Sequence, residues 1–323
     1  MTEPATPAPQ EPLLVVVLGP TGSGKSALAL ALAERFGGEI VNCDSVALYR
    51  DFEIGAAKPN REERARVPHH LFDVADPREQ MTAGEYARQA RQALLQIVAR
   101  GKLPVVAGGT GLYLRALLQG LSPSPQRQEE LRQKLRRRAK ARGSVYLHRL
   151  LARLDLRAAE KIHPNDTPKL IRAIEVCLAG RQPMTHLWQQ GREPLQGFGV
   201  LRLGLDPERQ ALYARINRRA QQMFASGLLE ETARLLVQYG QSAWALSSLG
   251  YKQAGQILRG ELSPELGVAK AQQGHRNYAK RQMTWFRREP DVRWLRGFGD
   301  DPAIQRQAEQ LIESRLPAAV SGV

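Results

Sequence analysis

A chain of 323 residues with a 42% apolar share can form one large domain or two of ordinary size around a sizeable core. Its 47 Lys and Arg residues against 32 Asp and Glu residues give a net charge of +15, which favours a polyanionic partner, most simply nucleic acid, over a merely basic chain. Cys43 and Cys177 show no metal-binding spacing, which argues against a zinc site or a disulfide framework and fits a reducing, cytoplasmic location.

The two ends of the chain predict no targeting or membrane element. No stretch approaches the roughly 18 uncharged apolar residues of a membrane helix, so no membrane span is predicted. Residues 1–12 are rich in Pro, Ala and Thr and lack the basic start and apolar segment of a signal peptide, which predicts a disordered tail. A flexible tail is also predicted for residues 311–323.

Residues 19–26 follow the pattern G-x-x-x-x-G-K-[ST] of a phosphate-binding loop. The apolar run 13–18 predicts a buried strand before the loop, and residues 26–36 predict a helix after it, which is the context that the motif requires. Backbone N–H groups and the helix N-terminus would hold phosphate oxygens, with Lys25 reaching the phosphates and Ser26 binding Mg²⁺. A di- or triphosphate is therefore the predicted ligand, and a chance glycine turn is the alternative. The predicted phosphate-binding residues are Gly19, Pro20, Thr21, Gly22, Ser23, Gly24, Lys25 and Ser26.

A second strand is predicted at residues 39–43, and Asp44 follows it directly. Ligands of open α/β sheets lie beyond the carboxyl ends of strands, which places Asp44 beside the phosphate site. After a predicted loop at 51–68, a third strand at 103–107 is followed by Gly108-Gly109-Thr110, where most phosphate-loop enzymes carry an Asp that holds Mg²⁺ through water. Thr110 is therefore a candidate phosphate or metal contact, and an ordinary nucleoside triphosphatase is disfavoured.

Two features between these strands are interpreted as structural. His69 and His70, in a short predicted strand, lack a spaced third ligand, so a metal site there is disfavoured. Thr82 and Glu85 have the spacing of a capping box, and the apolar stripe that follows predicts a helix closed by Gly101.

Residues 122–197 are predicted as a helical insertion. Its first helix, at 126–142, carries eight basic and two acidic residues, which favours a nucleic-acid contact over a solvated helix face. A strand at 200–205 marks the return to the core, followed by a helix at 212–239 and a turn at 247–253. The fold class is therefore predicted as α/β, with helices on both faces of a parallel P-loop sheet and an inserted all-helical domain.

The catalytic core is predicted to consist of residues 13–121 and 198–310. Residues 272–294 are its last segment with a clear sequence pattern. The segment interleaves Arg and Lys with four aromatic rings, Tyr278, Trp285, Phe286 and Trp294. Cations that meet phosphates and rings that stack on unpaired bases are typical of RNA binding. The same rings would also fit the core side of an amphipathic helix, and both interpretations can hold.

Several motifs together resemble those of bacterial tRNA dimethylallyltransferases, also called isopentenyl-tRNA transferases, the IPP transferase family. They occur in the family's order between about residues 13 and 296, and as a set they are specific, whereas the phosphate loop alone would not be. Besides that loop, they are the segments 44–50, 55–59, 108–113, 163–166, 250–253 and 280–287.

The resemblance implies transfer of a dimethylallyl group from dimethylallyl diphosphate to the exocyclic N6 amine of adenosine 37, next to the tRNA anticodon. It implies that Asp44 is the base that takes the amine proton, with binding of Mg²⁺ or helix capping as its alternative roles. Lys25, Thr110 and Arg219 would assist at the diphosphate, and Mg²⁺ on Ser26 would be the cofactor. The anticodon stem-loop of tRNA would be the partner of a monomeric, cytoplasmic enzyme.

The resemblance also implies a set of tRNA contacts. One departure weakens part of the set, because family members often carry Gln-Arg where this chain has Pro168-Lys169, and Lys lacks the planar fork of Arg. The implied contacts are Asp44, Ser45, Val46, Ala47, Thr110, Arg132, Pro168, Lys169, Leu170, Ile171, Arg172, Ser248, Leu249, Gly250, Tyr251, Lys252, Gln253, Lys280, Arg281, Gln282, Met283, Thr284, Trp285, Phe286 and Arg287.

Three other functions compete with this reading. A small-molecule or nucleotide kinase that uses ATP shares the loop and core but leaves the basic insertion and the C-terminal rings and arginines unexplained. A non-catalytic RNA-binding protein with a nucleotide switch would not need Asp44. An adenylate isopentenyltransferase that makes a free cytokinin would not need the tRNA-contacting segments.

Overall fold

The computed structural model describes residues 11–316 and divides the chain into two compact units. One unit runs to Leu118 and resumes at Leu195, and the other is Gln119–Pro194, within three residues of the predicted insertion at each end. Most of both predicted tails falls on 1–10 and 317–323, outside the described residues. The tail predicted from residue 311 is corrected, because helix α14 continues to Glu313 and buries Ile312 completely.

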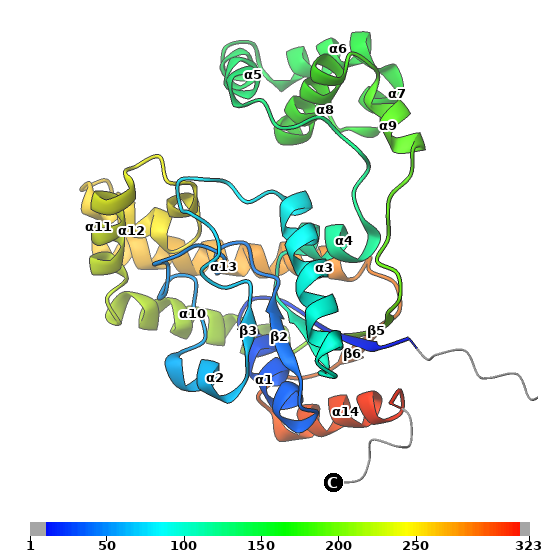
Figure 1. Cartoon of the computed structure of the whole chain (residues 1–323). Coiled ribbons are helices and arrows are strands. Elements are labelled where there is room, and N and C mark those ends of the chain that lie inside the picture. The colour runs from blue at the N-terminus through cyan, green and yellow to red at the C-terminus, as the bar shows by residue number, and fades with distance from the viewer. Residues whose placement is uncertain (1–10, 317–323) are drawn as a thin grey trace, which may run out of the picture. The chain divides into compact units, whose positions relative to one another are not determined.

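The first unit is built on a six-stranded sheet in the order β3-β2-β4-β1-β5-β6 (Figure 1). Every strand pairing in it is parallel, which confirms the predicted α/β fold class. The central strand β1 lies between β4 and β5, so the loop that follows it opens at the middle of the sheet. The strands are β1 (Leu13–Leu18), β2 (Glu39–Asn42), β3 (His69–His70), β4 (Pro104–Ala107), β5 (Gly199–Leu205) and β6 (Val292–Leu295).

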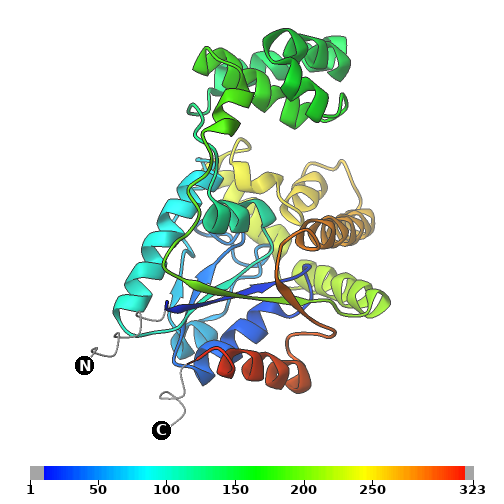
Figure 2. The same cartoon turned by 90° about the vertical axis from the view of Figure 1, so that its right-hand side faces the viewer.

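Helices cover both faces of the sheet, because β1 is apolar on both sides and alternate residues enter different cores. Val15 and Val17 pack with helices α1 and α14, which lie together on one face (Figure 2). Leu14, Val16 and Leu18 pack on the other face with α3, α4 and parts of α11, α12 and α13. The helices of this unit are α1 (Lys25–Arg35), α2 (Arg61–Arg66), α3 (Ala83–Ala99), α4 (Gly111–Gln119), α10 (Arg209–Ala225), α11 (Leu228–Tyr239), α12 (Tyr251–Leu258), α13 (Pro264–Phe286) and α14 (Pro302–Glu313), with a 3₁₀ turn η1 at Trp244–Ser247.

Some predicted elements are corrected by the structure. The helix predicted at 212–239 is two helices, α10 and α11, because Gly227 takes a left-handed conformation with φ of 97° between them. The predicted turn at 247–253 gives way to α12 at Tyr251, and the predicted loop at 51–68 contains α2. The segment 272–294 ends its helix at Phe286 and continues into strand β6, which no sequence pattern indicated.

The second unit is entirely helical within its described residues and has its own core, centred on Leu147, Leu151, Leu170 and Ile174. Its helices are α5 (Glu129–Arg142), α6 (Ser144–Leu154), α7 (Leu156–Lys161), α8 (Thr167–Gly180) and α9 (Met184–Gln189). No helix among residues 11–316 is long and apolar enough to cross a membrane.

The chain leaves the first unit and re-enters it at one point. The N–H of Leu195 donates to the carbonyl of Leu118 at 2.9 Å, which ties the outgoing segment to the returning one. These two residues are the bounds of the first unit on either side of the insertion. We call this pair the neck.

Candidate active site

The phosphate loop connects β1 to α1 and has the conformation that its glycines permit. Gly22 and Gly24 have φ of 81° and 86°, in the left-handed region that side chains avoid. A Cβ on Gly24 would also lie 2.8 Å from the backbone nitrogen of Gly299, so only glycine fits there. The Lys25 ammonium donates to the Pro20 carbonyl at 2.8 Å and thus lies folded over the loop.

Asp44 follows β2 and is held by one of its two carboxylate oxygens. Its Oδ1 accepts from the Val46 N–H at 2.8 Å and the Ala47 N–H at 3.4 Å. Asn42 fixes the Asp44 backbone, accepting from its N–H at 2.9 Å and donating to its carbonyl at 3.1 Å. Within the described part of the chain, Asp44 Oδ2 has no hydrogen-bond partner. The carboxylate is therefore oriented by its own turn and keeps one oxygen for a ligand.

Thr110 holds the Asp44 turn against β4. Its Oγ1 accepts from the Ser45 N–H at 3.0 Å, and its N–H donates to the Cys43 carbonyl at 3.1 Å. Thr110 also starts α4, since its carbonyl accepts from the N–H groups of Tyr113 and Leu114. A tether of the Asp44 turn is thus its observed role, and direct contact with a substrate stays a prediction.

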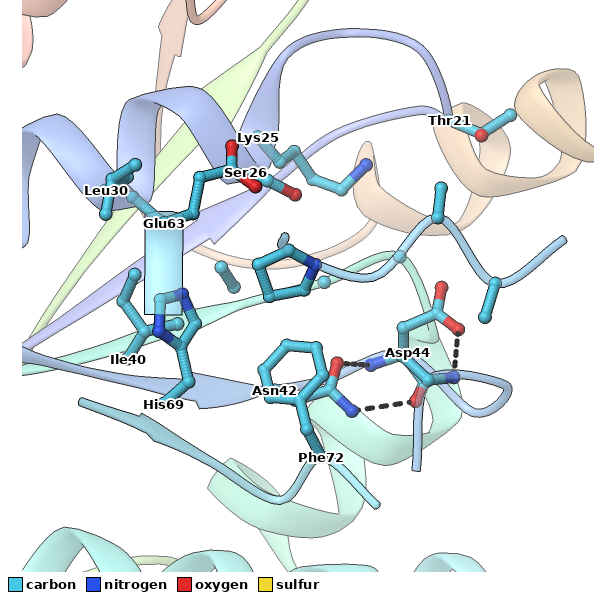
Figure 3. Close-up of a pocket in the computed structure, with 18 of the residues that line it drawn as sticks. Thr21, Lys25, Ser26, Leu30, Ile40, Asn42, Asp44, Glu63, His69 and Phe72 are labelled. Atoms are coloured by element: carbon cyan, nitrogen blue, oxygen red, sulfur yellow. Dashed lines mark hydrogen bonds between the residues drawn. The ribbon is translucent and has the colours of Figure 1, made fainter. Parts of the chain in front are cut away.

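One cavity of about 110 Å³ brings the phosphate loop and Asp44 together (Figure 3). Lys25 and Ser26 lie on one side of it and Asn42 and Asp44 on the other, while Arg219 reaches it from α10. The rest of its lining has an apolar part, made of Ala29, Leu30, Ile40, Ala56, Ala57, Pro59, Phe72 and Ala107, and a polar part that includes Thr21, Glu63, His69, Tyr278 and Gln282. Three of the four predicted catalytic residues, Asp44, Lys25 and Arg219, thus share one cavity.

Burial disfavours the charged forms of the two basic side chains that line the cavity, Lys25 and Arg219. Burial, reinforced by the neighbouring Arg219 cation, lowers the pKa of Lys25 to about 8. Burial also lowers the pKa of Arg219, whose Nη1 donates to Thr21 Oγ1 at 3.4 Å. Behind Arg219, burial lowers the pKa of His275 to about 4, which keeps this imidazole neutral. Two cations held close together form a ready counter-charge for a diphosphate.

The pKa of Lys25 predicts how ligand affinity depends on pH. Raising the pH from 7 to 9 is expected to weaken binding of an alkyl diphosphate about tenfold, because Lys25 loses its proton near pH 8 and such a ligand gains no further charge there. Equilibrium dissociation constants measured across this range check the prediction. In Lys25→Arg the guanidinium stays charged, so the dissociation constant should not change between pH 7 and 9. The same pH dependence in both proteins would contradict the assignment of this effect to Lys25.

The oxygen donors of the cavity fit a magnesium ion that is shared with a phosphate ligand. Ser26 and the carboxylates of Asp44 and Glu63 line the same space. Residues 11–316 contain no group of three or more His, Cys, Asp or Glu side chains that could hold a metal ion by itself. Mg²⁺ commonly takes only one or two protein ligands and completes its shell with phosphates and water, so this donor set suits it.

The predicted tRNA contacts differ widely in exposure. Exposed are Pro168, Lys169, Lys252, Lys280, Arg281, Thr284 and Arg287. Half-buried are Asp44, Ser45, Val46, Thr110, Arg132, Arg172, Ser248, Leu249, Met283 and Trp285. Buried are Ala47, Leu170, Ile171, Gly250, Tyr251, Gln253, Gln282 and Phe286, and their contact with tRNA stays a prediction.

Several of the predicted tRNA contacts form hydrogen bonds or ion pairs with other residues of the protein. The Tyr251 hydroxyl donates to the Glu231 carboxylate and accepts from the Gly55 N–H at 3.1 Å, which ties α12 to the 55–59 motif. In the second unit Glu175 is fully buried and accepts from Arg132 at 3.1 Å and Arg172 at 2.6 Å. Both arginines are therefore engaged in a buried ion pair, and their contact with tRNA stays a prediction.

The sequence interpretation overlooked part of the cavity. Asn42, His69, Phe72 and Tyr278 line it, although the sequence placed none of them in the phosphate site: His69 was weighed only as a metal ligand and Tyr278 only as an RNA-stacking ring. Asn42 could have been found, because a polar residue that ends a buried strand beside a ligand site is a recognisable signal. Phe72 and Tyr278 reach the cavity from segments distant in sequence, and no local pattern indicates that they meet the phosphate loop there.

A parallel sheet whose central strand leads through a glycine loop into a helix, with a lysine and a serine at the helix start, defines a P-loop protein. The IPP transferase family model matches residues 47–289, and the chain belongs to this family. A tRNA dimethylallyltransferase of Koribacter versatilis is 68% identical over 304 residues, which cover 94% of this chain and 99% of that protein. One of Solibacter usitatus is 52% identical over 91% of this chain and 96% of its own length.

Solved structures agree with this assignment. The full-length tRNA isopentenylpyrophosphate transferase of Bacillus halodurans superposes with a TM-score of 0.69 at 33% identity, covering 94% of this chain and 96% of that one. A eukaryotic dimethylallyltransferase, described as acting on tRNA, superposes with a TM-score of 0.79 at 26% identity, covering 95% and 81%. The chain thus spans nearly the whole length of its bacterial relatives.

Proposed function

We propose that this chain transfers a dimethylallyl group from dimethylallyl diphosphate to the N6 amine of adenosine 37 in tRNA, releasing diphosphate. The observation that carries the proposal is the shared cavity, in which the phosphate loop and two half-buried cations, Lys25 and Arg219, face a carboxylate that has one oxygen uncommitted within the described chain. The apolar wall, with Leu30, Ile40 and Phe72, suits an allyl chain better than a second phosphate.

The chemistry assigns a task to each side of the cavity. The adenine amine is a poor nucleophile because its lone pair is delocalised into the ring, so the reaction depends on charge that develops at the allylic carbon and on the departing diphosphate. Backbone N–H groups of the loop, Lys25 and Arg219 stabilise that diphosphate. Asp44 Oδ2 takes the amine proton as the new C–N bond forms. Mg²⁺, held by Ser26 and the diphosphate, would neutralise further negative charge on the leaving group.

Binding of tRNA requires cations that contact its phosphates and a target base that can enter the cavity. The exposed cations Lys280 and Arg281 on α13, and Arg287 directly after it, provide phosphate contacts. Because the adenine amine lies within a loop of stacked bases, the base must leave its stack to enter the cavity. We expect a monomer that acts in the cytoplasm on the anticodon stem-loop.

A transfer assay separates this function from a kinase. Purified protein, Mg²⁺ and unmodified tRNA are incubated with radiolabelled dimethylallyl diphosphate in one tube and with labelled ATP in another. Label that enters tRNA at the adenosine beside the anticodon supports the proposal. No transfer to tRNA, together with phosphate release or phosphate transfer from ATP, would overturn it. In a third tube AMP replaces tRNA, and transfer of the label to AMP but not to tRNA would indicate a cytokinin-type enzyme.

A further inference from the structure

Gln282 forms a bridge between the phosphate loop and the end of β4. Its side chain is only 4% exposed, on the inner face of α13. Its Oε1 accepts from the Thr21 N–H at 2.8 Å, and its Nε2 donates to the Gly109 carbonyl at 2.8 Å. The contact to Thr21 joins residues 261 apart in sequence. Both polar atoms of the amide are therefore used, one on each loop of the cavity.

The second glycine of the Gly108-Gly109-Thr110 motif is explained by this bridge. A Cβ on Gly109 would lie 2.2 Å from Gln282 Nε2, so the amide can approach only because Gly109 has no side chain. Tyr278, one helical turn earlier on α13, donates from its hydroxyl to the same carbonyl at 3.4 Å. Helix α13 thus presents two side chains to the backbone of one glycine.

The bridge continues from β4 to the candidate base. Thr110, next to Gly109, accepts from the Ser45 N–H at 3.0 Å and thereby holds the Asp44 turn. On the other side, Thr21 is also the residue whose hydroxyl accepts from Arg219. One buried amide therefore connects the loop that holds the diphosphate to the segment that carries Asp44. The opposite face of the same helical turns carries the exposed cations Lys280 and Arg281.

We propose that Gln282 is a positioning residue that sets the distance between the phosphate loop and the Asp44 turn, rather than a contact to tRNA. The inference rests on the proposed function. A shift of about 1 Å between the leaving diphosphate and the base can lower the rate of a chemical step on the order of 10²-fold. Loss of the bridge is therefore expected to act on the transfer step and not on tRNA affinity.

The test compares Gln282→Met with Gln272→Met. Methionine has a similar size and removes both hydrogen bonds of Gln282. In the control it removes one bond, from Gln272 Nε2 to the Asn217 carbonyl on α10, away from the phosphate loop. Single-turnover transfer is measured with saturating tRNA and dimethylallyl diphosphate, and tRNA affinity is measured by filter binding. Thermal unfolding reports whether each variant is folded.

For Gln282→Met we expect a single-turnover rate about 10²-fold below wild type, with tRNA affinity within twofold, while Gln272→Met keeps the wild-type rate. A rate within threefold of wild type, with only a lower melting temperature, would overturn the proposal. So would a loss of tRNA affinity equal to the loss in rate, which would make Gln282 a tRNA contact. Wild-type protein that transfers nothing to tRNA would overturn the proposed function and this role with it.

Gln282→Glu tests the proposal if the methionine variant does not fold. Glutamate can still accept from the Thr21 N–H but, when ionised, cannot donate to the Gly109 carbonyl. The titratable and charged groups that line the same cavity are Lys25, Asp44, Glu63, His69, Arg219 and Tyr278. We expect the same fall in single-turnover rate and an added rise in KM for dimethylallyl diphosphate from charge repulsion. An unchanged rate with a raised KM would overturn the bridging role.

Discussion

Asp44→Asn is expected to lower the transfer rate about 10³-fold while the affinity for dimethylallyl diphosphate changes little. Asparagine has the shape of aspartate, and its carbonyl oxygen can still accept from the Val46 N–H, so the turn should keep its conformation. Its amide cannot take a proton from the adenine amine. Single-turnover transfer and equilibrium binding of the diphosphate, measured on the same preparation, check the prediction.

A second aspartate provides the matched control. Asp51 lies on the same segment after β2, is exposed and accepts from the hydroxyl of Tyr239, away from the cavity. Asp51→Asn should therefore transfer at the wild-type rate. If Asp44→Asn instead lost the diphosphate in the presence of Mg²⁺, Asp44 would be a metal ligand, and its assignment as the base would be wrong.

Gly108→Ala is expected to lower the free energy of unfolding by about 3 kcal/mol and to abolish transfer. A Cβ at this position would lie 2.2 Å from the backbone carbon and oxygen of Cys43, which directly follows β2 and is held to the Ala107 carbonyl by its own N–H, so this backbone cannot move aside as a flexible side chain can. The methyl group would push the end of β4 away from the end of β2, where Asp44 follows. Urea denaturation gives the free energy, and the transfer assay gives the activity.

Gly199→Ala is the control for the loss of a glycine in the same sheet. Its Cβ would have the Glu11 carbonyl as its nearest neighbour at 3.9 Å, which is ordinary contact. The change in free energy should stay within about 0.5 kcal/mol. Equal losses for Gly108→Ala and Gly199→Ala would mean that the close approach of β2 and β4 is not what requires glycine at 108.

Local sequence patterns predicted β1 and the parts of the cavity formed by the phosphate loop, the start of α1 and Asp44. A buried strand, a glycine loop and a helix start lie within a few residues of one another, so their geometry follows from nearest neighbours, as it does for Asp44 at the end of β2. The parallel fold class is confirmed by every strand pairing. Membership of the IPP transferase family, suggested by the motifs, is confirmed by the family match and the bacterial relatives.

The sequence could not predict which motif residues face a ligand and which face the protein. Tyr251 and Phe286 are 1% exposed, although their motifs implied contact with tRNA. Their positions depend on partners such as Glu231, which lies on α11, a separate helix. For the rings of α13 the core interpretation holds at Phe286, and nothing in the helical period distinguishes a core ring from a base-stacking ring. The helix break at Gly227, in contrast, could have been anticipated from the glycine itself.

The neck between Leu118 and Leu195 has a consequence for how such a chain could arise. Because a backbone hydrogen bond joins Leu118 to Leu195, the chain between β4 and β5 is closed after α4, whatever lies beyond the neck. The entropic cost of closing a loop grows slowly with its length. An insertion that folds around its own core therefore costs the first unit little free energy of folding. The length and surface of the helical unit can therefore change without a change in the sheet-containing unit.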